Sequence, residues 1–282
     1  MILPAQAKLK GWQPLTPSGV ASFAHASVGR LLLVQFAAAT LVAAAMVWFL
    51  SANWLPSIRT AIHHLPARSE IRAGRLDWTM DSPLTLSEGH FLAFTVDLNH
   101  KDQLRLPSNI QVEFGRDSVR IYSLFGFAET GYPTGWTIPF CRPRLEPWWG
   151  AWEPPILWIT VGTAIAGLMV SWQLLATVYF LPVWLTGYYA NRNLSLLGSW
   201  KTAGAAMVPG ALLMAIGIVS YGLGALDLVE WVILFCVHFL IGWLYLFISP
   251  LCAPRLPSLS AARKNPFTVP EDDRNRPGGK WP

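Results

Sequence analysis

Four long stretches of the chain contain no charged residue, and they decide its class. Each is long enough to hold the roughly 20 apolar residues that cross a bilayer as a helix. The stretches run from Leu31 to Ile58, Pro154 to Asn191, Thr202 to Leu226 and Trp231 to Pro254. The pattern predicts an α-helical membrane protein with four transmembrane helices. We place these helices at residues 31–52, 154–186, 202–226 and 231–250.

The segment between the first two spans, residues 53–153, has a different pattern. Apolar and polar residues alternate in short runs, which is typical of strands. Ala73-Gly74 separates two such runs, and residues 115–117 separate Ile110–Phe114 from a run that contains Val119 and Ile121. The alternation predicts hairpins in a small, β-rich domain with an antiparallel sheet. We expect a short helical continuation from Asn53 and a loop over residues 131–155.

The remaining segments are short. Residues 1–30 form a leader in which Ser18 to Arg30 predicts a short interfacial helix, with Ser18 as its N-cap. Residues 187–201 are interpreted as a loop, and the Pro-rich, charged tail 251–282 as disordered. Pro182 and Pro209 predict bends in the second and third spans. The first span is interpreted as an uncleaved signal anchor, with cleavage near Ala45 or Ala52 as the alternative.

The distribution of charge predicts the orientation. Charged residues make up 13% of the chain, against about 25% in a typical soluble domain. Basic residues flank the first span on its leader side, lie in the 187–201 loop and follow the fourth span. Short basic segments stay in the cytoplasm, whereas long domains cross regardless of charge. We therefore place both termini in the cytoplasm and residues 53–153 outside it, and interpret the net charge of +5 as a topology signal rather than a nucleic-acid surface.

Few polar residues enter the predicted spans. His238 is the one ionisable group well inside a span, and Gln35 and Gln173 are amides in the first two spans. An ionisable residue in the membrane is a functional candidate, although a neutral His or Gln also serves by hydrogen-bonding a neighbouring helix. In the third span, Gly210 and Gly217 allow close helix packing near Pro209.

Motifs for catalysis or for cofactor and metal binding are missing from the sequence. There is no P-loop, nucleophile elbow, HExxH or dinucleotide fingerprint. His63 and His64 with His90 or His100 match no metal-ligand spacing, and Cys141 is the one cysteine of residues 53–153. Carboxylate pairs among Asp97, Asp102 and Glu113 are expected by chance in an exposed sheet. We therefore expect a non-enzymatic protein with no cofactor and no metal.

Three local stretches carry a resemblance. They are Ser27-Val28-Gly29-Arg30-Leu31-Leu32-Leu33; Ile71-Arg72-Ala73-Gly74-Arg75-Leu76 followed by Asp81-Ser82-Pro83 and Val96-Asp97-Leu98; and Leu196-Leu197-Gly198-Ser199-Trp200-Lys201-Thr202-Ala203 followed by Pro209. Together they resemble an uncharacterised group of bacterial integral membrane proteins, and the last is similar to the wider Yip-like group. The resemblance implies a bacterial inner-membrane location and this order of parts. It implies no activity, and no functional residue is carried over from it.

These observations favour an accessory, scaffold or assembly protein. Its partners would be the lipid bilayer and a membrane or extracytoplasmic protein, or a second copy of the chain. A transporter or channel component is the first alternative, with Gln35, Gln173 and His238 as polar lining. A ligand sensor that uses the external domain is the second. An enzyme acting on lipid through Asp227 or Glu230 is the least favoured.

Overall fold

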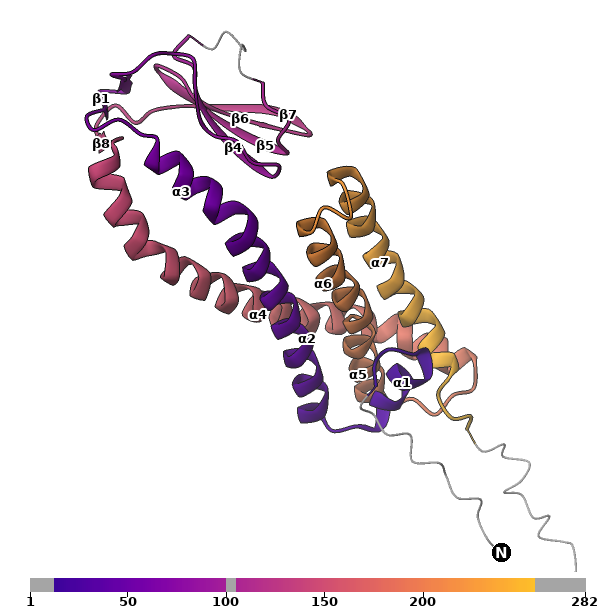
Figure 1. Ribbon diagram of the computed structural model, residues 1–282. Coiled ribbons are helices and arrows are strands. Elements are labelled where there is room, and N and C mark those ends of the chain that lie inside the picture. The colour runs from indigo at the N-terminus through magenta and orange to yellow at the C-terminus, as the bar shows by residue number, and fades with distance from the viewer. Residues whose placement is uncertain (1–12, 100–104, 257–282) are drawn as a thin grey trace, which may run out of the picture.

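The computed structural model describes residues 13–99 and 105–256. It contains four helices that are long and apolar enough to cross a membrane, as the sequence predicts. The helical segments are α1 (Pro17–Ser22), the 3-10 turn η1 (Phe23–His25), α2 (Val28–Phe49), the π-helical turn η2 (Leu50–Trp54), α3 (Leu55–His63), α4 (Arg142–Tyr189), α5 (Leu196–Ala206), α6 (Val208–Gly222) and α7 (Leu228–Leu251). A small β domain lies at one end of the helices (Figure 1). The predicted disordered tail lies almost entirely outside the described residues.

The first spanning helix is longer than predicted. It runs without a break through α2, η2 and α3, from Val28 to His63. Ser27 caps its start, where its side chain accepts a hydrogen bond from the backbone N–H of Arg30 at 3.2 Å. Its 36 residues give a length of about 54 Å, whereas the hydrocarbon core of a bilayer is about 30 Å thick. One end of this helix therefore projects beyond the membrane toward the β domain.

The second spanning helix, α4, corrects the predicted loop over residues 131–155. It begins at Arg142 and continues for 48 residues through Pro147, Pro154, Pro155 and Pro182. Proline keeps a helical φ angle and removes one backbone donor, so it bends a helix without necessarily ending it. The ribbon of α4 curves along its length accordingly (Figure 1). Its first turns are charged and lie beside α3, outside the stretch from which the span was predicted.

The third spanning helix is interrupted where proline predicts a bend. Helix α5 ends at Ala206 and α6 begins at Val208, with Pro209 in the first turn of α6. The predicted 187–201 loop is too long, because α5 already begins at Leu196. The Ser195 side chain caps this start by accepting from the N–H of Gly198 at 3.0 Å. Lys201 is therefore a helical residue, and a buried one.

The leader is part of the helix bundle rather than a helix on its surface. The predicted interfacial helix over 18–30 is divided into α1, η1 and the start of α2. Thr16, not Ser18, is the N-cap, and its Oγ1 accepts from the N–H of Gly19 at 3.1 Å. Val20 and Phe23 are completely buried and pack with Leu31 and residues of α4, α5 and α7. Because these apolar side chains are buried against protein, they do not form the lipid-facing side of an interfacial helix.

The β domain contains two sheets. The smaller has the order β2 (Arg75–Asp77), β1 (Glu70–Arg72) and β8 (Thr137–Pro139); the larger has the order β3 (Leu84–Ser87), β4 (Leu92–Val96), β5 (Ile110–Phe114), β6 (Ser118–Ser123) and β7 (Gly126–Gly131). Both predicted hairpins, β1–β2 and β5–β6, are present. The pairing is antiparallel with one exception, because β4 and β5 are parallel. The connection between these two strands is long enough to cross over and return in the same direction.

An apolar core joins the two sheets to α3. It contains Ile71, Leu76, Leu86, Val96 and Phe140, all buried. Tyr132 belongs to the same core and donates its hydroxyl to the carbonyl of Gly115 at 3.0 Å. Burial, with the charge of Asp117, raises the pKa of Tyr132, so this residue remains a neutral donor.

The β1–β2 turn allows a direct test of the hairpin. Ala73 and Gly74 both have positive φ, at 49° and 78°. A common two-residue hairpin turn has positive φ at both positions, and Asn-Gly is its preferred sequence. We expect Ala73→Asn to raise the thermal midpoint, because alanine disfavours this region by about 1 kcal/mol. Gly74→Ala should lower it, since the new Cβ would lie 3.0 Å from Thr134 Cγ2. Thermal unfolding of the detergent-solubilised chain measures both, and a lower midpoint for Ala73→Asn would contradict the turn.

Candidate functional site

Four aromatic rings join the β domain to the helix bundle. They are Phe49 at the end of α2, Phe91 just before β4, Tyr221 near the end of α6 and Trp231 in the first turn of α7. Ring centroids lie 5.5 Å apart for Phe49–Tyr221, 4.9 Å for Phe91–Tyr221 and 5.6 Å for Tyr221–Trp231. We call these four residues the junction cluster. Tyr221 is its centre, because it contacts the other three rings.

A hydrogen bond fixes the junction cluster to the larger sheet. The side-chain amide of Asn109, just before β5, donates to the Tyr221 hydroxyl at 2.6 Å. Gly222 allows the end of α6 to approach α2 closely, since a Cβ there would lie 2.6 Å from Trp48 Cζ3. Tyr221 is buried among these partners, so the junction cluster is a packed contact between the sheet and the helices.

Helix α3 contacts one edge of the larger sheet. His64 Nδ1 lies 2.5 Å from the carbonyl oxygen of Leu86 in the edge strand β3. At Gly89, just after β3, a Cβ would lie 2.6 Å from Ser57 Oγ of α3. The sheet and the helix are therefore in direct contact at this edge.

An ion pair and a histidine–carboxylate contact join α3 to the first turns of α4. The Arg59 guanidinium binds the carboxylate of Glu153, with one Nε–Oε2 distance of 2.9 Å. His63 Nε2 lies 3.2 Å from Glu146 Oε1. The projecting ends of the two long helices are thus tied together beneath the small sheet (Figure 1). The β domain is supported by α3, by α4 and by the junction cluster.

The opposite edge of the larger sheet is open. All six residues of β7 are exposed, and in the described part of the chain no strand pairs with its outer edge. Ser123 pairs with Gly126 across a two-residue turn, which makes them a hydrogen-bonded pair. Because such pairs alternate along an antiparallel ladder, the N–H groups of Phe127, Glu129 and Gly131 point outward. Sequence reasoning missed this edge, since strand order depends on contacts between distant residues.

The structure brings together two of the three polar residues singled out in the spans. Gln35 is completely buried. Its Nε2 donates to the carbonyl of Gly204 at 3.1 Å, and its Oε1 accepts from Gln173 Nε2 at 2.7 Å. This link joins α2, α4 and α5. It pairs both polar atoms of Gln35 inside the bundle, and hydrogen bonds of this kind join helices in a membrane.

His238 lies elsewhere, at the contact between α6 and α7. Its Nδ1 contacts the carbonyl of Phe235 in its own helix. A Cβ at Gly210 would lie 2.9 Å from the His238 carbonyl, and one at Gly217 would overlap Leu234. The two glycines therefore lie where α6 and α7 approach most closely. The three polar residues do not form one continuous site.

Lys201 of α5 is a buried charged residue that sequence reasoning missed. Its Nζ donates to the carbonyl of Ala26 at 2.6 Å, so it ties α5 to the residue that follows η1. The sequence places it in a loop because a charge ends the third apolar stretch. Its small neighbours, such as Gly198 and Ala203, are the signal that this segment is packed, since small residues let helices approach.

Carboxylates and histidines of the β domain form no metal site in the described residues. No group of three or more His, Cys, Asp or Glu side chains is close enough there to hold a metal ion. His90 packs against Phe91, apart from His63 and His64. Asp97 and Glu113 are buried, contrary to the expected exposed sheet. Asp102 and His100 lie outside the described residues.

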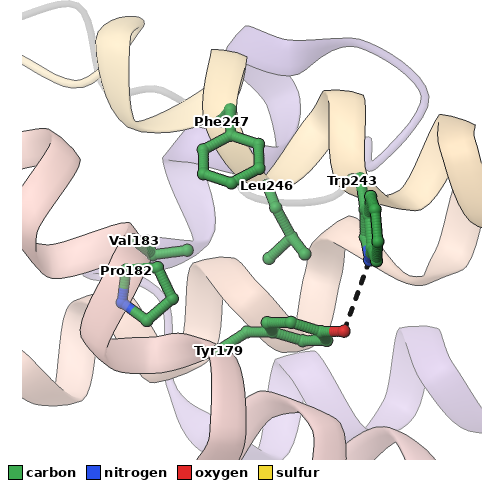
Figure 2. Close-up of a pocket in the computed structure, with 6 residues that line it drawn as sticks. All are labelled: Tyr179, Pro182, Val183, Trp243, Leu246 and Phe247. Carbon is green, nitrogen blue, oxygen red and sulfur yellow. Dashed lines mark hydrogen bonds between the residues drawn. The ribbon is translucent and has the colours of Figure 1, made fainter.

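An apolar groove lies between α4 and α7 within the membrane-spanning segments. Tyr179, Pro182 and Val183 of α4 face Trp243, Leu246 and Phe247 of α7 across a cavity of about 180 Å³ (Figure 2). Trp243 Nε1 donates to the Tyr179 hydroxyl at 3.3 Å. The polar atoms of these two side chains thus satisfy each other, and the rest of the lining is apolar.

Comparisons with models of known protein families, with curated proteins and with solved structures find no match. The resemblance to a Yip-like group of bacterial membrane proteins therefore stays a prediction.

The Gln35–Gln173 link can be measured by a double-mutant cycle. We expect Gln35→Leu and Gln173→Leu each to destabilise the protein, with a coupling of about 0.6–1.7 kcal/mol, as found for hydrogen bonds between membrane helices. Thr40→Val is the control, because its hydroxyl donates to its own helix at Phe36 and is exposed. Unfolding in detergent measures all variants. Additive effects of the two Gln substitutions would show that the bond contributes nothing to stability.

Proposed function

We propose that this protein is a non-enzymatic accessory or assembly factor of the bacterial inner membrane whose β domain binds a protein partner. The proposal rests on one observation: the two edge strands of the larger sheet differ in what lies next to them. Helix α3 contacts β3, whereas no strand among the described residues pairs with the outer edge of β7. An open edge strand is a template for pairing with another chain.

The composition of β7 supports this use of the edge. Natural proteins protect exposed edges with charged side chains, especially lysine, and with proline, bulges or very short strands. The β7 sequence Gly-Phe-Ala-Glu-Thr-Gly has neither lysine nor proline, the carboxylate of its one charged residue, Glu129, binds Arg120 and Ser118 of the neighbouring strand β6, and its six residues pair in unbroken register with β6. A peptide strand that adds to such an edge gains backbone hydrogen bonds and contacts to alternate side chains. The occupant we propose is a strand of a membrane or extracytoplasmic protein.

The supports of the domain fit a docking role. The contacts from α3 to α4 and the Asn109–Tyr221 bond restrict rotation of the sheet relative to the bundle. A partner strand at β7 would therefore be held at a defined height above the bilayer. The distribution of basic residues supports placing the termini in the cytoplasm and the β domain on the other side.

The alternative functions have less support. A transporter needs polar groups that line a path, but Gln35 and Gln173 bind each other and Gly204 inside the bundle. A ligand sensor is favoured by one feature, a polar cavity of about 530 Å³ beside the small sheet. Its lining includes Arg68, Arg144, Glu70, Asp77 and Cys141. We keep the sensor as the second candidate.

Proline at the open edge tests the docking role. Glu129→Pro removes an outward N–H and no ladder hydrogen bond, and proline is tolerated at an edge. Glu129→Ala is the matched control, because both variants lose the ion pair with Arg120. With a photoreactive residue at Thr130, we expect the parent chain and Glu129→Ala to crosslink to one stoichiometric protein in native membranes. Glu129→Pro should lose most of that product.

A photoreactive residue at Thr85 in β3, the strand that contacts α3, measures the background of non-specific crosslinking. Mass spectrometry identifies the product, and a species of twice the chain mass would make a second copy the partner. If the parent chain gives no product at Thr130 above that at Thr85, the docking proposal is wrong. The polar cavity beside the small sheet would then be the next place to search for a ligand.

A further inference from the structure

The tip of the β6–β7 hairpin carries an apolar patch that no described residue covers. Leu124 and Phe125 form the two-residue turn, and Phe127 follows in β7. All three are exposed, and Phe125 is 88% exposed. Single exposed apolar residues are ordinary on a protein surface. Three within four positions at a hairpin tip are a local apolar patch, and such patches mark interaction sites.

The tip of the β6–β7 hairpin lies at the end of the β domain that faces the helix bundle. Gln111 of β5 pairs with Tyr122 of β6, and Asn109, two residues earlier, binds Tyr221 of the bundle. The tip therefore lies at the end of the sheet that faces the helices. Ser123 and Leu124 line the same cavity, of about 210 Å³, as Leu228, the first residue of α7. The tip is thus at the level where the apolar span α7 begins.

This level corresponds to the membrane interface. Trp231 lies in the first turn of α7 and Tyr221 near the end of α6, and both side chains prefer the headgroup region. The capping box of α7 is charged: Asp227 accepts from the N–H of Glu230 at 2.7 Å, and the Glu230 carboxylate accepts from the N–H of Asp227 at 2.9 Å. These carboxylates require water. Water and lipid therefore meet at the height of the hairpin tip.

Cations lie immediately behind the apolar patch. The Arg105 guanidinium is 4.3 Å from the centre of the Tyr122 ring, and that of Arg120 is 5.5 Å from the centre of the Phe127 ring. Apolar side chains ahead of arginines are the arrangement of interfacial membrane anchors. The apolar groups enter the acyl boundary, and Arg105 remains at the level of the lipid phosphates, whereas Arg120 is paired with Glu129.

We propose that the β6–β7 hairpin tip inserts Leu124 and Phe125 into the leaflet on the β-domain side of the bilayer, with Phe127 at the headgroup level. The ligand is the phospholipid surface itself. This contact supports the β domain on the side opposite to α3. It also means that a strand added to β7 would begin at the membrane surface and run away from it. The insertion does not depend on whether β7 has a partner.

A photoreactive diazirine side chain at Phe125 tests the insertion in the otherwise unchanged chain. The full chain is reconstituted in vesicles of phosphatidylcholine and phosphatidylglycerol. We expect the residue at 125 to crosslink to phospholipid. The control is the same side chain at Trp136, which is 71% exposed but lies next to β8, at the other end of the domain. It should give little lipid product.

An environment-sensitive fluorophore provides an independent measurement. With Cys141, Cys236 and Cys252 replaced by Ser, Phe125→Cys and Trp136→Cys are labelled and compared in the same vesicles. Emission at 125 should shift to the blue and be quenched by lipids that carry a nitroxide near the headgroup, and emission at 136 should remain that of a label in water. If both positions behave alike, or if the diazirine at 125 captures only water or protein, the hairpin does not insert. This experiment measures contact with lipid and not pairing at β7. A negative result would therefore overturn the insertion without bearing on the docking proposal.

Discussion

The first two spanning helices are much longer than a bilayer is thick, and the position of the β domain depends on this excess. Helices of 36 and 48 residues measure about 54 and 72 Å, against a hydrocarbon core of about 30 Å. Helical segments of a few turns are only marginally stable on their own in water. Two features stabilise the helix ends next to the β domain: the contacts of Arg59 and His63 with carboxylates of α4, and the apolar core that α3 shares with the sheets. The domain and the two projecting helix ends therefore form one structural unit.

Inside the bundle, three polar side chains form hydrogen bonds between neighbouring elements. Gln35, Gln173 and Lys201 each bind a carbonyl or an amide of another element. An unpaired polar group in an apolar environment costs several kcal/mol, so these bonds fix which helices can be neighbours. They also connect the leader to α5 through Ala26. The leader is consequently a component of the packed bundle, and not an appendage of the first span.

Sequence patterns predicted the number of spans correctly because the length of an apolar run is a local property. Helix boundaries were less predictable, since a helix does not end where the lipid ends. Helix α4 begins with charged turns at Arg142, before its apolar stretch starts. Helix α5 likewise includes the charged Lys201, which lies before the third apolar stretch. Gln35 and Gln173 were recognisable as polar residues in apolar spans, but their pairing depends on how α2 and α4 pack. The parallel pairing of β4 with β5, the open edge of β7 and the insertion level of the hairpin tip depend on contacts between distant residues.

The pairing of β1 with β8 has a consequence for how the chain is made. Ile71 lies opposite Ile138, so the small sheet closes only when residues at both ends of the β domain are present. Strand β8 is followed almost at once by Arg142, the first residue of α4. During synthesis, the small sheet therefore cannot be completed until the chain has been made to within a few residues of the second spanning helix.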